Sequence, residues 1–258
     1  MLLHRITQHV KEQNWFAVGL DFLIVVVGVF VGLQVSNWNA ERFERMQERD
    51  YLVRLYDDFV ESINGQTRDL NFLSQQLSDQ AAILKSLDTC DVETDDGAAF
   101  QRGINTLGYI NPPRIFRRTV DEMVAAGRTD IIRNQALKDQ LSGIIALVEW
   151  RGNSFTESVS RTTEHYRFII EEEVRYDFTR KYPDPFVGEF IGVDYDIAAL
   201  CQSPKIANAV SAISYATRER RRAYEPILQE YKDFLPVLED ELRTRWGIDP
   251  TQTEEAAP

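Results

Sequence analysis

An apolar run lies near the start of the chain, in the stretch WFAVGLDFLIVVVGVFVGLQV from Trp15 to Val35. Its only charged side chain is Asp21. A helix through these residues would be about 31 Å long at roughly 1.5 Å per residue, which matches the hydrocarbon core of a bilayer. Trp15 and Trp38 flank the run where aromatic side chains usually meet the membrane interface. The pattern therefore predicts a transmembrane helix over residues 15–36.

A cleavable signal peptide is the main alternative interpretation of this run. Signal peptidase requires small residues just before its cut, and a cut after Ala40 would place Trp38 at the third position before it. The run is also long for the apolar core of a signal peptide. We therefore expect the helix to stay in the protein as a membrane anchor.

The charges beside the run indicate its orientation. Two basic residues precede it, whereas Arg42, Arg45 and Arg49 follow it, so a count of basic residues favours neither side. Acidic residues are interleaved among the later arginines, and net charge then favours a cytoplasmic N-terminus. We expect a single-pass protein of the bacterial inner membrane with a periplasmic soluble domain. Residues 1–14 are predicted to form an amphipathic helix on the inner leaflet, or else a frayed terminus.

Small and polar residues of the run share one face of the predicted helix. At about 100° per residue, roughly a third of the circumference holds Ala17, Asp21, Gly28, Gly32 and Ser36. The small residues of this series allow a second helix to approach closely. An ionised carboxylate at the depth of Asp21 would cost on the order of 1–3 kcal/mol. The face thus predicts a helix-packing seam that contains an intramembrane polar site.

Three interpretations of Asp21 stay open. In the first, its neutral carboxyl group forms hydrogen bonds across the seam of a homo-oligomer. In the second, it is a proton-relay or ion-pair site that faces a membrane partner, in a layout similar to that of single-span stator subunits of proton-driven motors. The peptidoglycan-binding motifs typical of such subunits are not apparent. In the third, the side chain only reaches the nearby lipid headgroups.

After Trp38 the spacing of apolar residues becomes helical. Three- and four-residue steps connect Leu52, Leu55, Phe59, Ile63, Leu70, Leu73, Leu77, Leu84 and Leu87. Gln66 and Gln80 interrupt this seam, so we expect bundle packing rather than a long coiled coil. The predicted organisation is an amphipathic tail (1–14), a transmembrane helix (15–36), a stalk continuous with it that becomes the first bundle helix (37–88), a helical bundle (89–248) and a disordered tail (249–258). The expected fold class is all-α.

Breaks between the later helices follow from Gly, Pro, Asn and polar clusters. The predicted elements are a loop at Asp88–Gly97, helices over 98–109 and 115–126, a helix from Asn134 to about Phe178, a non-helical stretch at 181–193 and a short helix from Asp196 to Cys201. A small strand or a functional loop within 181–193 is an alternative for that stretch. Gly127 is expected to end the second of these helices. Ser203 and Pro204 are expected to start a last helix that reaches Trp246, which Pro226 and Pro236 should kink or split. We expect Phe186, Phe190 and Ile191 to pack onto the bundle.

Two segments resemble a large bacterial family of single-pass membrane proteins that has no assigned activity. The first is GLDFLIVVVGVFVGLQVSNWNAER, from Gly19 to Arg42, with an acid near the start of the helix and a Gln-x-x-Asn-Trp-Asn exit. The second is TVDEMVAAGRTDIIRNQALKDQL, from Thr119 to Leu141. The resemblance covers the anchor well and the soluble part more loosely. It implies the membrane topology and no mechanism.

The chain has a formal net charge of -12. A net acidic chain is a poor partner for nucleic acid, because phosphate binding requires a basic face. The two cysteines, Cys90 and Cys201, lack the paired spacings of zinc or redox sites. They are candidates for one disulfide in an oxidising compartment, or else two unrelated small residues. The acidic loop TCDVETDDG lacks the spacing of a calcium loop and is interpreted as solvated.

Few residues of the soluble part are suited to catalysis. His165 is its only histidine, which argues against zinc and di-iron centres. No nucleophile-elbow, Walker A or dinucleotide-binding motif occurs, and no carboxylate pair stands out among many acids. We therefore expect no metal, no cofactor and no enzymatic activity.

One basic cluster contains Arg218, Arg220, Arg221 and Arg222. It is a candidate patch for an anionic ligand, lipid headgroups or an acidic partner. The alternative is that these arginines pair with acids of the bundle such as Glu171, Glu172 and Glu173.

The sequence therefore favours a membrane-anchored helical scaffold or interaction protein. Its expected partners are the lipid bilayer, further copies of itself and other membrane proteins, and not nucleic acid. The alternative is an accessory subunit of a proton-coupled or transport complex that uses Asp21. A ligand sensor would need a separate transducing partner.

Overall fold

The computed structural model describes residues 15–92 and 97–252. The predicted tail helix at 1–14 and the last part of the predicted C-terminal tail lie outside the described residues. The chain divides into two compact units, Met1–Asp50 and Tyr51–Pro258. Each unit is described by itself below.

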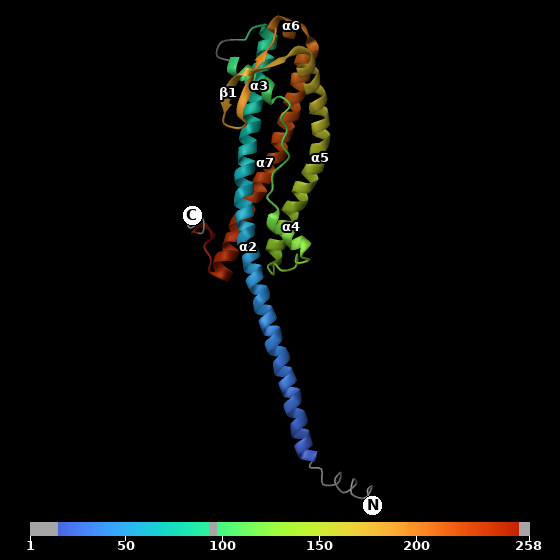
Figure 1. The fold of residues 1–258 in the computed structure, drawn as a ribbon, viewed down its shortest axis with the longest axis vertical. Coiled ribbons are helices and arrows are strands. Elements are labelled where there is room, and N and C mark those ends of the chain that lie inside the picture. The colour runs from blue at the N-terminus through green and yellow to red at the C-terminus, as the bar shows by residue number, and fades with distance from the viewer. Residues whose placement is uncertain (1–14, 93–96, 253–258) are drawn as a thin grey trace, which may run out of the picture. The chain divides into compact units, whose positions relative to one another are not determined.

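Helices dominate the structure, with 77% of the described residues in helices and 8% in strands, so the predicted all-α class is right except for one small sheet. In chain order, and with the labels of Figure 1, the elements are α2 (Trp15–Thr89), α3 (Gly97–Thr106), α4 (Arg118–Ala125), α5 (Gln135–Glu173), β1 (Arg175–Asp184), β2 (Gly188–Asp194), α6 (Ile197–Gln202), α7 (Pro204–Trp246) and the 3-10 turn η1 (Pro250–Gln252). The stalk prediction agrees with α2, which continues from the apolar run.

Several predicted helix ends are confirmed by their hydrogen bonds. Asn134 caps α5, because its side-chain oxygen accepts from the Leu137 N–H at 3.2 Å. Asp196 caps α6 in the same way through the N–H groups of its first turn. Gly127 follows α4 with a φ of 64°, the left-handed conformation that glycine adopts readily. Ser203 precedes α7 but makes no side-chain capping bond, so only Pro204 starts that helix as predicted.

The hairpin of β1 and β2 corrects the predicted end of α5. That helix ends at Glu173 rather than near Phe178, and an antiparallel pair follows at 175–194. Val174, Tyr176 and Phe178 alternate with polar residues, which is a strand pattern that the helix prediction overlooked. Phe190 is buried as predicted, and the ring of Phe186 lies 5.7 Å from that of Phe72 on α2.

A bulge interrupts the hairpin between Asp177 and Lys181. The Asp177 carboxylate accepts hydrogen bonds from the backbone and hydroxyl of Thr179 and from Nε of Arg180. These bonds, led by that of the Thr179 hydroxyl, lower the pKa of Asp177 to about 2. An acidic side chain therefore fixes the irregular turn of this strand.

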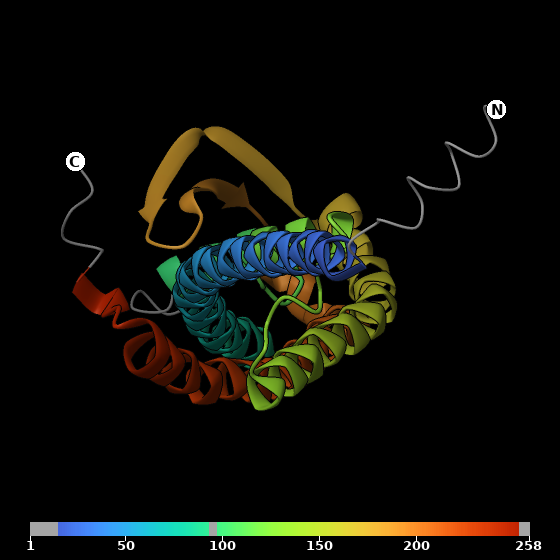
Figure 2. The same cartoon turned by 90° about the horizontal axis from the view of Figure 1, so that it is seen from below.

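Two apolar clusters form the core of the second unit. The first combines residues 51–73 of α2, the first turns of α5, α4 and the last half of α7, with Phe59, Tyr231 and Phe234 at its centre. The second combines the end of α2, α3, Ile169 of α5 and the first turns of α7. Figures 1 and 2 show α2, α5 and α7 running lengthwise beside one another. The two clusters therefore lie toward opposite ends of the bundle.

The face that α2 buries agrees with the predicted seam only in part. Leu52, Leu55 and Phe59 are fully buried as expected, but Ile63, Leu70, Leu77 and Leu84 are only half-buried. The buried positions there are largely polar: Ser62, Gln66, Asp69, Gln76, Asp79 and Gln80. The predicted seam is therefore confirmed at Leu73 and Leu87 as well, and between them the buried side chains are largely polar and have partners inside the protein.

The C-terminal end also differs from its prediction. Helix α7 is not split, although Pro226 and Pro236 lie inside it. It ends at Trp246 as predicted, and Gly247 caps it with a φ of 66°. The prediction of disorder from Asp249 onward is wrong for residues 249–252. The Asp249 carboxylate accepts hydrogen bonds from Thr251 and Arg243, and η1 follows it.

Candidate functional site

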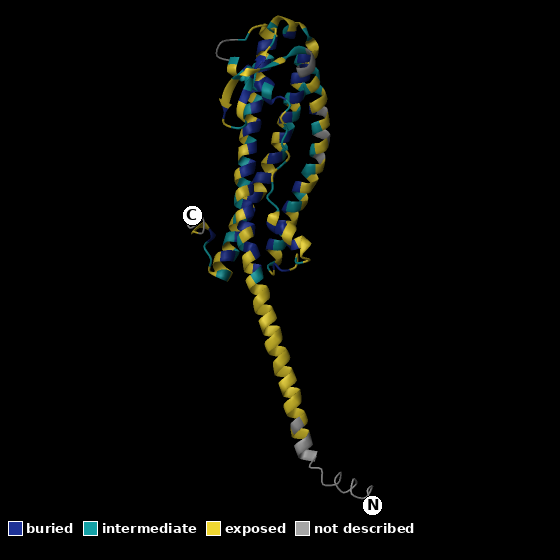
Figure 3. Cartoon of the chain, in the orientation of Figure 1, coloured by how far each residue is buried: buried dark blue, intermediate teal, exposed yellow. Residues whose placement is uncertain are grey.

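The side chains of the apolar run are exposed on all sides within their own unit. The large apolar residues from Leu20 to Val35 are 45–70% exposed, which Figure 3 shows as a continuous exposed stretch of α2. One apolar helix near the N-terminus is therefore long enough to span a membrane. Trp38 is 63% exposed, and the guanidinium of Arg42 lies 5.9 Å from its ring centre.

The predicted packing face is only partly described. A Cβ atom added to Gly28 or Gly32 would meet nothing within 4 Å in the single chain, and Ser36 is exposed. The side chains of Trp15, Ala17 and Asp21 lie outside the described residues, and so does the predicted polar site at Asp21. The packing seam remains a prediction.

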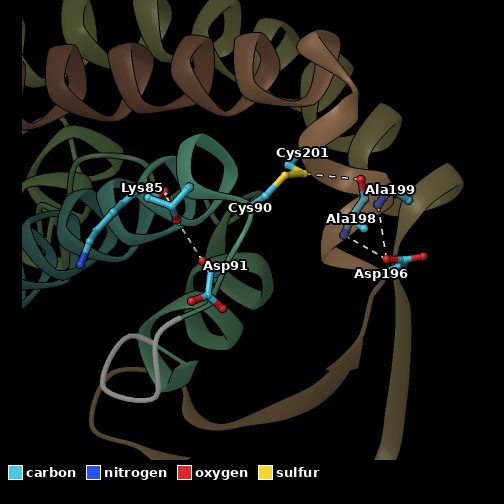
Figure 4. The surroundings of a disulfide bond; sticks show 8 residues. Lys85, Cys90, Asp91, Asp196, Ala198, Ala199 and Cys201 are labelled. Atoms are coloured by element: carbon cyan, nitrogen blue, oxygen red, sulfur yellow. Dashed lines mark hydrogen bonds between the residues drawn. A yellow bond between two sulfur atoms is a disulfide. The ribbon is translucent and has the colours of Figure 1, made fainter.

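Cys90 and Cys201 are brought together by the fold. A disulfide joins them across 111 residues of sequence, with their Cα atoms 5.5 Å apart (Figure 4). It connects the residue after α2 to α6. Cys90 has a φ of 54° and is the only described non-glycine residue in the left-handed region.

An extended connection (residues 107–117) joins α3 to α4 and lies between the long helices. Figures 1 and 2 show it running lengthwise along the bundle, and its residues are half-buried or exposed apart from Leu107. The N–H groups of Arg114 and Phe116 donate to Gln66 and Ser62 of α2. Tyr224 and Tyr231 of α7 donate their hydroxyls to carbonyl groups of the same connection. Side chains thus replace the strand partners that an extended backbone normally needs.

Three buried carboxylates of α2 accept hydrogen bonds from arginines near this connection. Asp79 is 1% exposed and binds Arg102 through two bonds of 2.7 and 2.6 Å. Asp69 binds Nε of Arg114 at 2.8 Å, and Asp58 binds Nε of Arg118 at 3.0 Å. These pairs explain why α2 carries acids on its inner face, since a buried charge needs a partner.

Asp69 gives the domain a pH dependence. Burial raises its pKa above the ordinary 3.8, and the Arg114 charge opposes this only in part. A carboxyl group whose pKa is raised on folding stabilises the fold while protonated, and that contribution is lost as pH rises through the folded pKa.

Replacing Asp69 by Asn should remove this dependence. Between about pH 4 and the folded pKa of Asp69, the unfolding free energy of the wild type should fall more with rising pH than that of Asp69→Asn. Urea titrations of both proteins at several pH values measure the difference. If the unfolding free energies of the two proteins changed equally with pH, the pH dependence would not come from Asp69.

The predicted arginine patch is divided by the fold. Arg218, Arg221 and Arg222 are exposed, whereas Arg220 is only 5% exposed. Arg221 and Arg222 pair with Glu225 and Glu219 of their own helix at 3.3 and 3.6 Å. The side chains of Glu171 and Glu172 are outside the described residues, so their pairing is untested. The four arginines therefore do not form one surface patch.

Arg220 lies in a polar layer between the two apolar clusters. Its Nη2 donates to the hydroxyl of Thr217 at 3.0 Å, and that hydroxyl also accepts from Nε2 of Gln80 on α2 at 3.2 Å. Nε and Nη1 of Arg220 have no hydrogen-bond partner, and neither has Oε1 of Gln80. Burial lowers the pKa of Arg220, but a guanidinium stays protonated in proteins. Gln80 and Arg220 each stand out in the sequence, but no sequence pattern places the two side chains together.

A shallow apolar cleft lies between α4 and α5. Its volume is about 360 Å³, and apolar side chains such as Val120, Met123 and Ile145 line it together with Arg117 and Glu149. Arg117 also pairs with Glu149 at 2.7 Å, so the charges at its rim are mutually satisfied.

Within residues 15–92 and 97–252, no group of three or more acidic, His or Cys side chains is arranged to hold a metal ion. The observed features define a mainly helical domain with one disulfide, linked to one candidate membrane span. No family model, curated protein or solved structure matches the chain. The resemblance of its anchor to an uncharacterised bacterial family therefore stays a prediction.

Proposed function

We propose that this protein is a single-pass membrane-anchored scaffold that associates with itself through its apolar helix. The supporting observation is that the apolar side chains of the run are exposed around the whole circumference of α2 within their unit. Such a surface is stable in lipid and costly in water. The bilayer, further copies of the chain and other membrane proteins are the partners that this surface suits.

The proposed location of the soluble domain is the periplasm, with the N-terminus in the cytoplasm. The juxtaposition of Cys90 and Cys201 supports this proposal, because disulfides persist in oxidising compartments and are rare in the cytosol. A reporter enzyme that is active only in the periplasm, fused after residue 258, tests the orientation. Activity of a cytoplasm-specific reporter at the same position would overturn it.

Self-association is proposed to use the face that contains Gly28 and Gly32. Both positions are open in the single chain, so leucine fits there without harming the monomer. Leucine at either position should block close helix approach and lower the yield of crosslinked oligomers in native membranes at least about fivefold. Gly19 is the matched control, since it is equally open and lies about 180° away around the helix.

The expected result is that Gly28→Leu and Gly32→Leu lose crosslinked oligomers and Gly19→Leu keeps them. Equal yields from all three variants would exclude this seam. Wild-type protein that stays in the aqueous fraction without detergent would overturn the membrane anchor itself. The alternative function in a proton-coupled complex has no observation among the described residues that favours it.

A further inference from the structure

We propose that the polar layer around Arg220 is a binding site for a small organic carboxylate that also carries a hydrogen-bond donor. The site is formed by Gln80 of α2 and by Thr217 and Arg220 of α7, which are linked through the Thr217 hydroxyl. All three side chains are at least nine-tenths buried. This proposal is independent of the self-association proposed above.

The charge of Arg220 is the first argument. The other arginines that reach the inner face of α2 each have a carboxylate: Arg102 has Asp79, Arg114 has Asp69 and Arg118 has Asp58. Among the residues whose side chains are described, Arg220 has none, and its Nε and Nη1 groups have no hydrogen-bond partner there. A buried charge without a counter-charge is strongly destabilising, so an anion that reached it would bind with a large gain.

The shape of the donor set is the second argument. A guanidinium presents its N–H groups in a planar fork that matches the two oxygens of a carboxylate. Gln80 Oε1 is a buried acceptor without a partner on the neighbouring helix. A ligand with a carboxylate for Arg220 and a hydroxyl or amino group for Gln80 would satisfy both. The unpaired groups therefore point to a small hydroxy or amino acid.

A ligand must also be able to reach the buried side chain of Arg220. Arg220 lies on α7 between Ile213, which belongs to the second apolar cluster, and Tyr224, which belongs to the first. The part of α5 beside Arg220 lies between Val148 and Ile169. Among the side chains that are described in this part, only that of Thr162 is buried. Tyr166 and Phe168 of this stretch pack against the second apolar cluster, and a helix segment with so few apolar contacts opens at lower cost than a well-packed one. A small ligand can therefore enter beside the middle of α5.

Thermal unfolding of the full-length protein in detergent tests the site. The probes are glycolate, which has both a carboxylate and a donor, acetate, which lacks the donor, glycolamide, which lacks the charge, and inorganic phosphate. Ionic strength is held constant with chloride. Glycolate at ten times its Kd should raise the Tm by about 3–6 °C, acetate less, and glycolamide not at all.

Two variants assign the effect to Arg220. Arg220→Met should itself raise the Tm by a few degrees, because it removes an unpaired buried charge, and should abolish the shift caused by glycolate. Arg218→Met is the matched control: it removes an exposed arginine of the same helix and should keep the shift. Gln80→Leu should reduce the advantage of glycolate over acetate.

Each remaining outcome overturns the proposal. Absence of any shift in the wild type, with a more stable Arg220→Met variant, would show that Arg220 is only a strained structural residue. A shift that persists in Arg220→Met would place the ligand elsewhere. A shift by phosphate but not by glycolate would exclude the carboxylate class.

Discussion

Loss of the crosslink between Cys90 and Cys201 should lower the free energy of unfolding by about 3–4 kcal/mol. The bridge spans 111 residues, and the chain-entropy account gives about 4.8 kcal/mol for such a loop, from which measured values usually fall somewhat short. The Cys90→Ala, Cys201→Ala protein should therefore unfold at clearly lower urea concentration than the wild type. Wild-type cysteines that react with maleimide in native membranes without reduction would contradict the bridge.

The backbone of Cys90 supplies an internal control for this experiment. Its φ of 54° is unfavourable for a residue with a Cβ atom and suits glycine. Cys90→Gly and Cys90→Ala lose the same bridge, so any difference between them reports the backbone alone. Cys90→Gly should be more stable by about 1 kcal/mol. Equal stabilities would mean that the left-handed turn after α2 does not persist without the disulfide.

Substitution of Arg102 by Met should cost about 3 kcal/mol of unfolding free energy. The change leaves the Asp79 carboxylate, which is 1% exposed, without the two bonds that Arg102 donates. Removal of one member of a buried ion pair is far more harmful than removal of both. Urea denaturation of the full-length protein in detergent measures the loss.

Two further variants test whether an unpaired buried charge causes this loss of stability. Arg54→Met removes an ion pair with Glu122 in which both side chains are about half exposed, and should change stability by less than about 1 kcal/mol. Asp79→Leu combined with Arg102→Met should recover most of the stability lost in the single variant. A double variant as unstable as Arg102→Met would show that packing, and not an unpaired charge, caused the loss.

Local signals in the sequence were sufficient for much of the fold. The capping side chain of Asn134, the left-handed Gly127 and the Pro204 start of α7 act through their immediate neighbours, so they could be predicted without knowledge of the tertiary structure. The apolar run likewise carries its own signal. The start of the hairpin at β1 was missed because a short alternating stretch directly follows a long helical pattern.

The polar interior of the bundle could not be predicted in the same way. Gln66 and Gln80 looked like defects in an apolar seam, whereas Gln66 accepts from a backbone N–H 48 residues later and Gln80 donates to Thr217, 137 residues later. Spacing along one helix does not reveal such distant partners. The interpretation of the arginine cluster as one patch fails for a related reason, because adjacent residues on a helix point in different directions and only Arg220 turns inward, while Arg221 and Arg222 pair with acids as the alternative expected.

The extended connection at 107–117 also constrains the order in which the protein can assemble. Its hydrogen-bond partners lie about 50 residues earlier, on α2, and more than 110 residues later, on α7. A chain made from its N-terminus cannot complete these bonds until Tyr231 has been synthesised. The last helix must therefore be more than half made before this connection can be held against both of its neighbours.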